Sequence, residues 1–197
     1  MSAERGRLVA VDGVNGAAVR AAARAENAAV PPARRGGVSV WDASGVFEDL
    51  TLADRAAGAP SARTLLLLYA ADLAFRLRWE IRPTLAEGRT VVAAPYVATA
   101  VAFGRAAGLP RGWLKDLFTF AARPNEARLV HAAPSRAAAD RSGFVEFGCD
   151  RLAARSYGLS RRRLVDQTRA HLQTSSRRIT KARKPTKTMK RPGDELV

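Results

Sequence analysis

A glycine-bearing turn near the start of the chain has residue types that could hold phosphate. It covers residues 12–16 and follows an apolar run, residues 8–11, that is typical of a buried parallel strand. An alanine-rich run with strong helix propensity, residues 17–29, comes directly after the turn. Because a turn between a strand and a helix N-terminus presents backbone N–H groups to an anion, this segment is the first candidate for binding chemistry.

The phosphate-binding pattern of this turn is incomplete. A complete loop reads G-x-x-x-x-G-K-[ST], in which the Lys neutralises phosphate charge and the hydroxyl holds Mg²⁺. Here Ala18 stands in place of the last Gly, Val19 in place of the Lys and Arg20 in place of the hydroxyl residue. Alone, the segment favours an ordinary strand-to-helix turn. The candidate nucleotide-binding residues of this degenerate loop are Gly13, Asn15, Gly16 and Arg20.

The elements that must position this turn alternate between strand-like and helix-like runs. This alternation predicts a three-layer α/β/α sandwich with a parallel sheet. We expect one α/β domain over residues 1–173 and a separate segment over residues 174–197. The expected strands are residues 8–11, 38–41, 90–94 and 127–132; the expected helices are 17–29, 62–85, 97–107 and 113–121, with further helices from 135 and near 161.

Positive charge is concentrated at the C-terminal end. The chain has a formal net charge of +15, but residues 1–150 hold 19 Lys and Arg against 15 Asp and Glu, whereas residues 151–197 hold 14 against 3. We expect residues 174–197 to be a disordered basic tail that binds nucleic acid, an acidic partner or anionic lipid, or that only keeps the protein soluble. The candidate anion-binding residues are Arg177, Arg178, Lys181, Arg183, Lys184, Lys187, Lys190 and Arg191.

Composition points to a soluble cytoplasmic protein. The most apolar run, residues 65–71, is far shorter than the ~20 residues that a transmembrane helix needs. The first residues include Glu4 and Arg5 and contain no apolar stretch of a signal peptide. A single cysteine, Cys149, forms no internal disulfide and fits a reducing compartment.

Several further segments resemble, in order and spacing, the thymidylate kinase (dTMP kinase) family. The resemblance covers about residues 7–170 and implies a P-loop nucleotide kinase fold with a five-stranded parallel sheet. It also implies ATP and dTMP as substrates, Mg²⁺, dTDP as product and often a homodimer. The segments that carry it are Leu68-Tyr69-Ala70-Ala71-Asp72, residues 81–88, Tyr96-x-x-Thr99-x-x-Ala102-Phe103, residues 108–114, residues 134–141 and Phe144-x-Glu146-x-Gly148-x-Asp150.

The charged phosphate ligands that the resemblance implies are missing from this sequence. Phosphoryl transfer depends on positioning and on neutralising phosphate charge, so their joint loss predicts a catalytically silent protein. We therefore assign no catalytic residue and no metal ligand. The loop Lys falls on Val19, the Mg²⁺-binding hydroxyl on Arg20, the Arg for the acceptor phosphate on Leu73, the Asp-Arg pair of the third strand on Ala94-Pro95 and the fourth-strand Asp on Ala132.

The uncharged part of the implied nucleoside pocket is better preserved. Tyr69 falls on the aromatic position that stacks on thymine in the family, and an aromatic ring can hold a base without charge. The alternative is that these side chains are ordinary core residues. The nucleoside-pocket candidates are Tyr69, Tyr96, Thr99 and Phe103.

Three functions follow from these residues. The first is a thymidylate kinase-like pseudoenzyme that serves as a scaffold, a regulator or a weak binder of ATP or dTMP, with a homodimer formed by its Ala- and Leu-rich helices. The second is a divergent active dTMP kinase that uses ATP and Mg²⁺. The third is a nucleic-acid-associated protein that acts through its basic tail.

Overall fold

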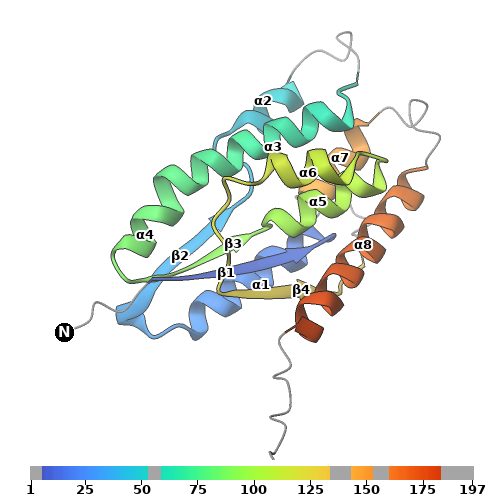
Figure 1. Cartoon of the computed structure of the whole chain (residues 1–197). Helices are drawn as coiled ribbons and strands as arrows, with labels where there is room; N and C mark the ends of the chain where they lie inside the picture. Colours follow the sequence, from blue (N-terminus) through green and yellow to red (C-terminus); the bar gives the residue numbers. More distant parts are fainter. Residues whose placement is uncertain (1–5, 53–58, 134–142, 153–159, 183–197) are drawn as a thin grey trace, which may run out of the picture.

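Four short strands form a parallel sheet at the centre of the molecule (Figure 1). The computed structural model describes residues 6–52, 59–133, 143–152 and 160–182. The strand order is β2-β3-β1-β4, and every neighbouring pair runs parallel, so helices must provide the crossover connections. The strands are β1 Arg7–Gly13, β2 Arg35–Val40, β3 Thr90–Ala94 and β4 Glu126–Val130.

Helices cover both faces of the sheet because its central strand is apolar on both sides. Leu8 and Ala10 of β1 belong to a large core cluster, while Val9 and Val11 belong to a smaller one. Helix α1 covers the smaller cluster, and α3, α5, α7 and α8 cover the larger (Figure 1). The predicted three-layer α/β architecture is confirmed. The helices are α1 Gly16–Ala29, η1 Pro32–Arg34, α2 Val46–Leu52, α3 Ala62–Arg76, η3 Leu77–Ile81, α4 Arg82–Ala86, α5 Val97–Ala106, α6 Arg111–Leu117, α7 Phe144–Arg151 and α8 Arg161–Ala182.

The sheet has fewer strands than the resemblance implied. Five were expected, and the described part of the chain contains four. Strand β4 is an edge of this four-stranded sheet, and its charged side chains form ion pairs, as is typical of an edge strand. Residues 134–142, which follow β4, lie outside the described residues.

The helix predicted over residues 62–85 is present, with a local change in its winding. Helices α3 and α4 are continuous through η3, a π-helical stretch in which the Arg82 N–H donates to the Leu77 carbonyl. Pro83 follows at once and has no N–H to donate. A π-helical turn is a common way to accommodate a proline within a helix, because the α-helical hydrogen-bond ladder is interrupted there in any case.

Helix α8 extends into the segment that was predicted to be a disordered tail. Residues 174–182 are helical, so the expected boundary at Thr174 is wrong for the backbone of this part. The hydroxyl groups of Thr174 and Ser175 donate to the carbonyls of Ala170 and His171, one turn earlier. These side chains are therefore accommodated inside the helix. The candidates Arg177, Arg178 and Lys181 lie on this last part of α8, whereas Arg183, Lys184, Lys187, Lys190 and Arg191 lie outside the described residues.

None of the helices in the described ranges combines the length and the apolarity needed to span a bilayer.

Candidate functional site

The candidate residues gather at one edge of the sheet, where the parallel strands end. In parallel α/β proteins this carboxyl edge is the usual place for a ligand. The turns after β1, β2 and β3 meet there with the first turns of α1, α2 and α5 (Figure 1). The predicted glycine-bearing turn and the predicted nucleoside-pocket residues both belong to this edge.

The first turn of α1 is capped by two side chains of the chain itself. The Asn15 Oδ1 accepts from the Ala18 N–H at 2.8 Å, as an N-cap residue does. The Gly16 N–H donates at 3.1 Å to Oε2 of Glu146, which lies on α7 and has no solvent-exposed surface. The same oxygen accepts from the Gly143 N–H at 3.2 Å. A buried carboxylate therefore occupies the hydrogen-bonding direction that a phosphate oxygen would need at Gly16.

Helix α7 begins in direct contact with this turn. A Cβ atom added to Gly143 would lie 2.6 Å from the Gly16 Cα and 2.9 Å from its nitrogen, closer than real Cβ atoms approach other atoms. Only a glycine fits at residue 143 without moving backbone. The close approach of Gly143 to Gly16 holds the Glu146 carboxylate against the α1 terminus.

Val19, which replaces the loop Lys, is a core residue. It is 1% exposed and packs in the smaller core cluster against strands β1 and β3. Its Cγ2 would lie only 2.8 Å from a Cβ at Gly13, so the two positions fit closely together. Arg20 is half-buried on the same helix. The described part of this turn has no cation in the place of the Lys.

Asp12, the acidic residue near the end of β1, caps α5 from inside the protein. Its Oδ1 accepts from the backbone N–H groups of Tyr96 and Thr99 at 3.0 and 2.9 Å and from the Thr99 hydroxyl at 2.7 Å. The Gly13 N–H in turn donates to the Thr99 hydroxyl. Desolvation raises the pKa of Asp12 above its usual value, although these hydrogen bonds and the charge of Arg76 oppose that rise.

Asp42 and Asp72 fix the turn after β2. Asp42 adopts a left-handed backbone conformation, φ 64°, and its carboxylate accepts from the N–H groups of Phe47 and Glu48 in the first turn of α2. Asp72 on α3 accepts from the Asp42 N–H and from the N–H and hydroxyl of Ser44. These contacts shape the segment that stands where the resemblance implied an Arg-containing loop.

Arg76 is the buried cation of this edge. It is fully buried, lies 3.7 Å from the Asp72 carboxylate and donates to the Pro95 carbonyl at 2.9 Å. Leu73, at the position implied to grip the acceptor phosphate, is also fully buried. Arg76, about one turn after Leu73 on α3, thus forms an internal ion pair with Asp72 and a hydrogen bond to the backbone that follows β3.

The nucleoside-pocket candidates lie in the core around Phe144. Tyr69 and Phe103 have no exposed surface, and their ring centroids lie 4.5 and 5.1 Å from that of Phe144 on α7. Burial raises the pKa of the Tyr96 hydroxyl to about 12, and this hydroxyl donates to the Ala122 carbonyl. Thr99 is bonded to Asp12, as described above. The structure therefore brings Tyr69 and Phe103 together and leaves base stacking by them a prediction.

Sequence reasoning missed the residues that complete this edge. The sequence predicts Glu146 to be a structural cap or an ion-pair partner of Arg141 or Arg151, and it places Phe144 only in a motif. The spacing of Asp72 and Arg76, four residues apart on an expected helix, was a usable signal for their pairing. Asp12 was assigned only to a turn, because no sequence pattern reveals that its carboxylate reaches a helix 84 residues away.

Comparisons with known proteins agree with this fold. A protein of Saccharolobus solfataricus named probable thymidylate kinase 2 is 26% identical over 130 residues, which are 66% of this chain and 61% of that protein. A probable thymidylate kinase of Pyrococcus horikoshii is 39% identical over 64 residues, 32% of this chain and 31% of that protein. The crystal structure of thymidylate kinase from Ehrlichia chaffeensis matches with a TM-score of 0.66 over 89% of this chain and 83% of that one. The chain is thymidylate kinase-like.

The similarity to these proteins covers only part of their length, and the sequence identity to the matched crystal structure is low. The thymidylate kinase-like chain spans less than two thirds of each of these curated relatives. The matched crystal structure is 9% identical in sequence and therefore bears on the fold alone. No protein-family model matches the chain.

Removing the Glu146 carboxylate is expected to destabilise the protein. Glu146→Ala leaves the buried N–H groups of Gly16 and Gly143 without an acceptor, at a cost of about 2–4 kcal/mol in the free energy of unfolding. Glu146→Gln keeps an amide oxygen and should cost less. Urea unfolding measures both, with the exposed Glu87→Ala as matched control. Equal stabilities of Glu146→Ala and Glu87→Ala would contradict the capping role.

The raised pKa of Asp12 predicts a pH dependence of stability. In the window between the usual value of 3.8 and the raised value in the folded state, the folded protein binds more protons than the unfolded one. The contribution of Asp12 to stability therefore falls as the pH rises through this window. The stability difference between the wild type and Asp12→Asn should be larger at about pH 4 than at about pH 7, as measured by urea unfolding. A stability difference that grows with pH would contradict the raised pKa of Asp12.

Proposed function

We propose that this thymidylate kinase-like chain is catalytically silent and acts as a scaffold or regulatory protein. The observation that carries the proposal is the Glu146 carboxylate on the Gly16 N–H. In the phosphoryl-transfer reaction that the resemblance implies, this amide and a neighbouring Lys would face phosphate. Here the amide has a negatively charged partner from the same chain, and the Lys position is Val19.

The buried charges at this edge support the same proposal. Three buried carboxylates, those of Asp12, Asp72 and Glu146, stand against one buried cation, Arg76, among the described residues. At an effective dielectric constant of about 20, two like charges about 4 Å apart repel each other by about 4 kcal/mol. A phosphate group brought to this edge would meet net negative charge, whereas phosphoryl transfer needs positive charge there.

Magnesium-bound ATP does not fit the residues present. Arg20 replaces the hydroxyl residue that would hold Mg²⁺, and residue 94 is Ala in place of an acidic side chain. Within the described ranges no three His, Cys, Asp or Glu side chains gather as a metal-ion cluster. We therefore derive no catalytic step through Mg²⁺ for this chain.

Kinase activity is the direct test. The full chain, incubated with ATP, Mg²⁺ and dTMP, should form no dTDP above a blank without protein, in an assay that separates the nucleotides by chromatography. An Arg20→Ala variant should give the same result as the wild type. Formation of dTDP that is lost in Arg20→Ala would overturn the proposal and support the divergent active kinase instead.

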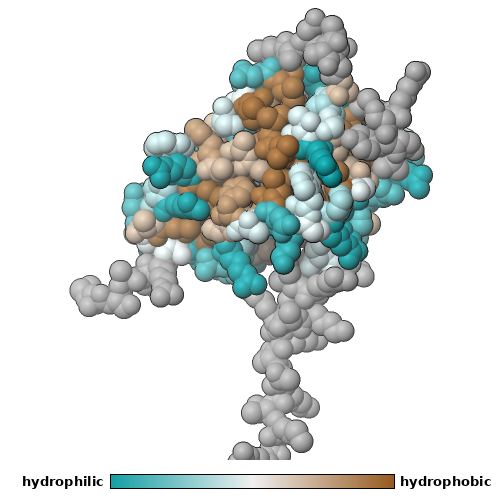
Figure 2. Space-filling model, turned by 45° about the horizontal axis from the view of Figure 1, so that its top comes forward, coloured by the Kyte–Doolittle hydropathy of each residue, from teal (hydrophilic) through white to brown (hydrophobic). Residues whose placement is uncertain are grey.

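A second copy of the chain is the partner that the proposal implies. Leu67, Phe75 and Trp79 on α3 and η3 are 53%, 40% and 65% exposed and follow one another at intervals of eight and four residues. Such intervals place side chains near one face of a helix. Figure 2, which brings the top of Figure 1 forward, shows apolar surface gathered on this side of the molecule. An apolar face of this kind is typical of an interface between identical chains.

A homodimer through this face predicts a loss of association in a polar variant. The wild type should have twice the chain mass in light scattering after gel filtration, whereas Leu67→Asp/Trp79→Asp should have the mass of one chain. Phe120→Ser, which changes an exposed apolar residue outside α3, is the matched control and should stay dimeric. A monomeric wild type would refute this assembly.

A further inference from the structure

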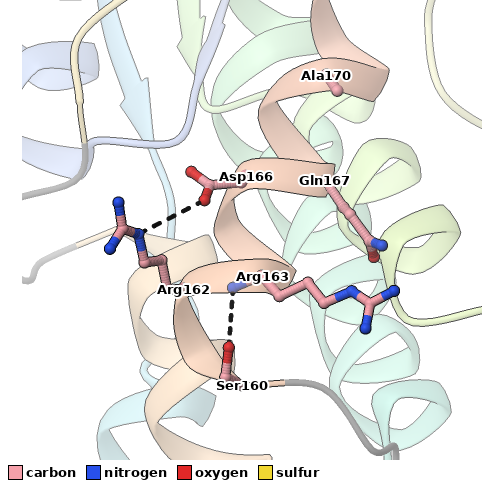
Figure 3. A pocket seen from close by; sticks show the side chains of 6 residues that line it. All are labelled: Ser160, Arg162, Arg163, Asp166, Gln167 and Ala170. Atoms are coloured by element: carbon pink, nitrogen blue, oxygen red, sulfur yellow. Dashed lines mark hydrogen bonds and ion pairs between the residues drawn. The ribbon is translucent and has the colours of Figure 1, made fainter.

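An open groove with several charged and amide side chains runs along α8 and shares no residue with the carboxyl edge of the sheet. It consists of two adjoining hollows of about 460 and 480 Å³ that share Gln167 and Ala170. The first is lined by Ser160, Arg162, Arg163 and Asp166 of the α8 region (Figure 3), and the second by His171 and by residues 105–108 at the end of α5. We propose that this groove binds the phosphate backbone of single-stranded nucleic acid.

The side chains along the groove have a regular spacing. Arg163, Gln167 and His171 follow one another at intervals of four residues on α8, so they lie in one row on its surface. At a rise of about 1.5 Å per residue, successive members of this row are about 6 Å apart along the helix axis. In Figure 3 the Arg163 and Gln167 side chains extend from the same side of α8. Such a row of hydrogen-bond donors suits a ligand with repeated acceptors.

The charges of α8 are divided between its two sides. Arg161 lies 2.8 Å from the Asp150 carboxylate, and Arg162 lies 4.0 Å from that of Asp166, so both are paired. The guanidinium of Arg163 has no ion pair among the described residues. Figure 3 shows Arg162 and Asp166 together on the side opposite Arg163. The one carboxylate that lines the groove is thus paired and directed away from the row.

The wall formed by the end of α5 adds positive charge. Arg105 lines the second hollow beside His171. Partial burial lowers the pKa of His171, and the charges of Arg105 and Arg111 lower it further. The two arginines are therefore close enough for their positive field to act on the imidazole. The same positive field would attract an anion that enters the groove.

The type of ligand follows from what the groove offers. The residues that line the two hollows provide cations and an amide donor but no Phe, Tyr or Trp ring on which a base could stack. Contacts of this type position a phosphate backbone without reading its sequence. The proposal is independent of catalytic silence, because the groove shares no residue with the carboxyl edge of the sheet.

Two exposed arginines on different faces of the molecule allow a matched test with the full chain. Arg163→Ala removes a cation of the groove, whereas Arg24→Ala removes the same charge from α1, which lines neither hollow. Fluorescence anisotropy of a labelled single-stranded DNA of about 20 nucleotides, titrated at several salt concentrations, measures both. One phosphate contact contributes about 0.7 to the salt slope and about fivefold to the affinity at about 0.1 M salt.

We expect Arg163→Ala to lose about fivefold in affinity and to reduce the salt slope by about 0.7, while Arg24→Ala stays within about twofold of the wild type. Equal losses in the two variants would show that only net charge matters, and would overturn the groove as a site. No loss in either would overturn it as well. Unlabelled single-stranded DNA should displace the probe, and displacement by polyglutamate or by phosphatidylserine vesicles at the same charge concentration would overturn the choice of ligand. Circular dichroism of both variants verifies their folding.

Discussion

The backbone N–H groups at the carboxyl edge of the sheet are satisfied by carboxylates of the same chain, and the remaining structure depends on this arrangement. The Asp12 carboxylate accepts hydrogen bonds from N–H groups at the start of α5, that of Asp42 from the start of α2, and that of Glu146 from the start of α1. Exposed helix N-termini are positive and attract anions, so each of these contacts removes a binding position for an external phosphate. At this edge the acidic side chains of the chain itself occupy hydrogen-bonding positions that an anion would otherwise take.

The position of α7 follows from this constraint and from apolar packing together. Glu146 ties the start of α7 to α1, and Phe144 places its ring within 6.2 Å of those of Trp41, Phe47, Tyr69 and Phe103. A Cβ added to Gly148 would lie 2.6 Å from the Phe103 ring, which requires a glycine where α7 meets α5. The polar contact fixes the register of α7, and burial of aromatic surface provides most of its stabilisation. Displacing α7 would expose both the buried carboxylate's partners and the aromatic cluster.

The sequence was sufficient to predict the strands and most of the helices, but it did not predict the contacts at their ends. The apolar run of β1 and the long helix after Ser61 could be predicted because short-range periodicity and a capping residue determine them. Helix α2 was not predicted, since its cap is Asp42 in a left-handed conformation that depends on Asp72, 30 residues away. The Glu146–Gly16 contact spans 130 residues and leaves no local pattern. Val19 at the implied Lys position could be identified directly from the sequence, whereas the Glu146 carboxylate that accepts from the Gly16 N–H could not.

The distribution of charge separates the interior of this fold from its surface. Although the chain carries a net charge of +15, its buried charged groups at the carboxyl edge are mainly acidic, and Arg163 of α8, which has no ion pair among the described residues, is exposed to solvent. A buried carboxylate is tolerated because several N–H donors compensate for its lost hydration, whereas a surplus of buried cations would need acceptors that the N–H-rich edge does not provide. Positive charge is therefore retained where water solvates it, outside the edge at which a phosphotransferase would need it. Under the proposed function, the carboxylates of the chain occupy the phosphate positions of this edge, which leaves the surface as the place where anions can bind.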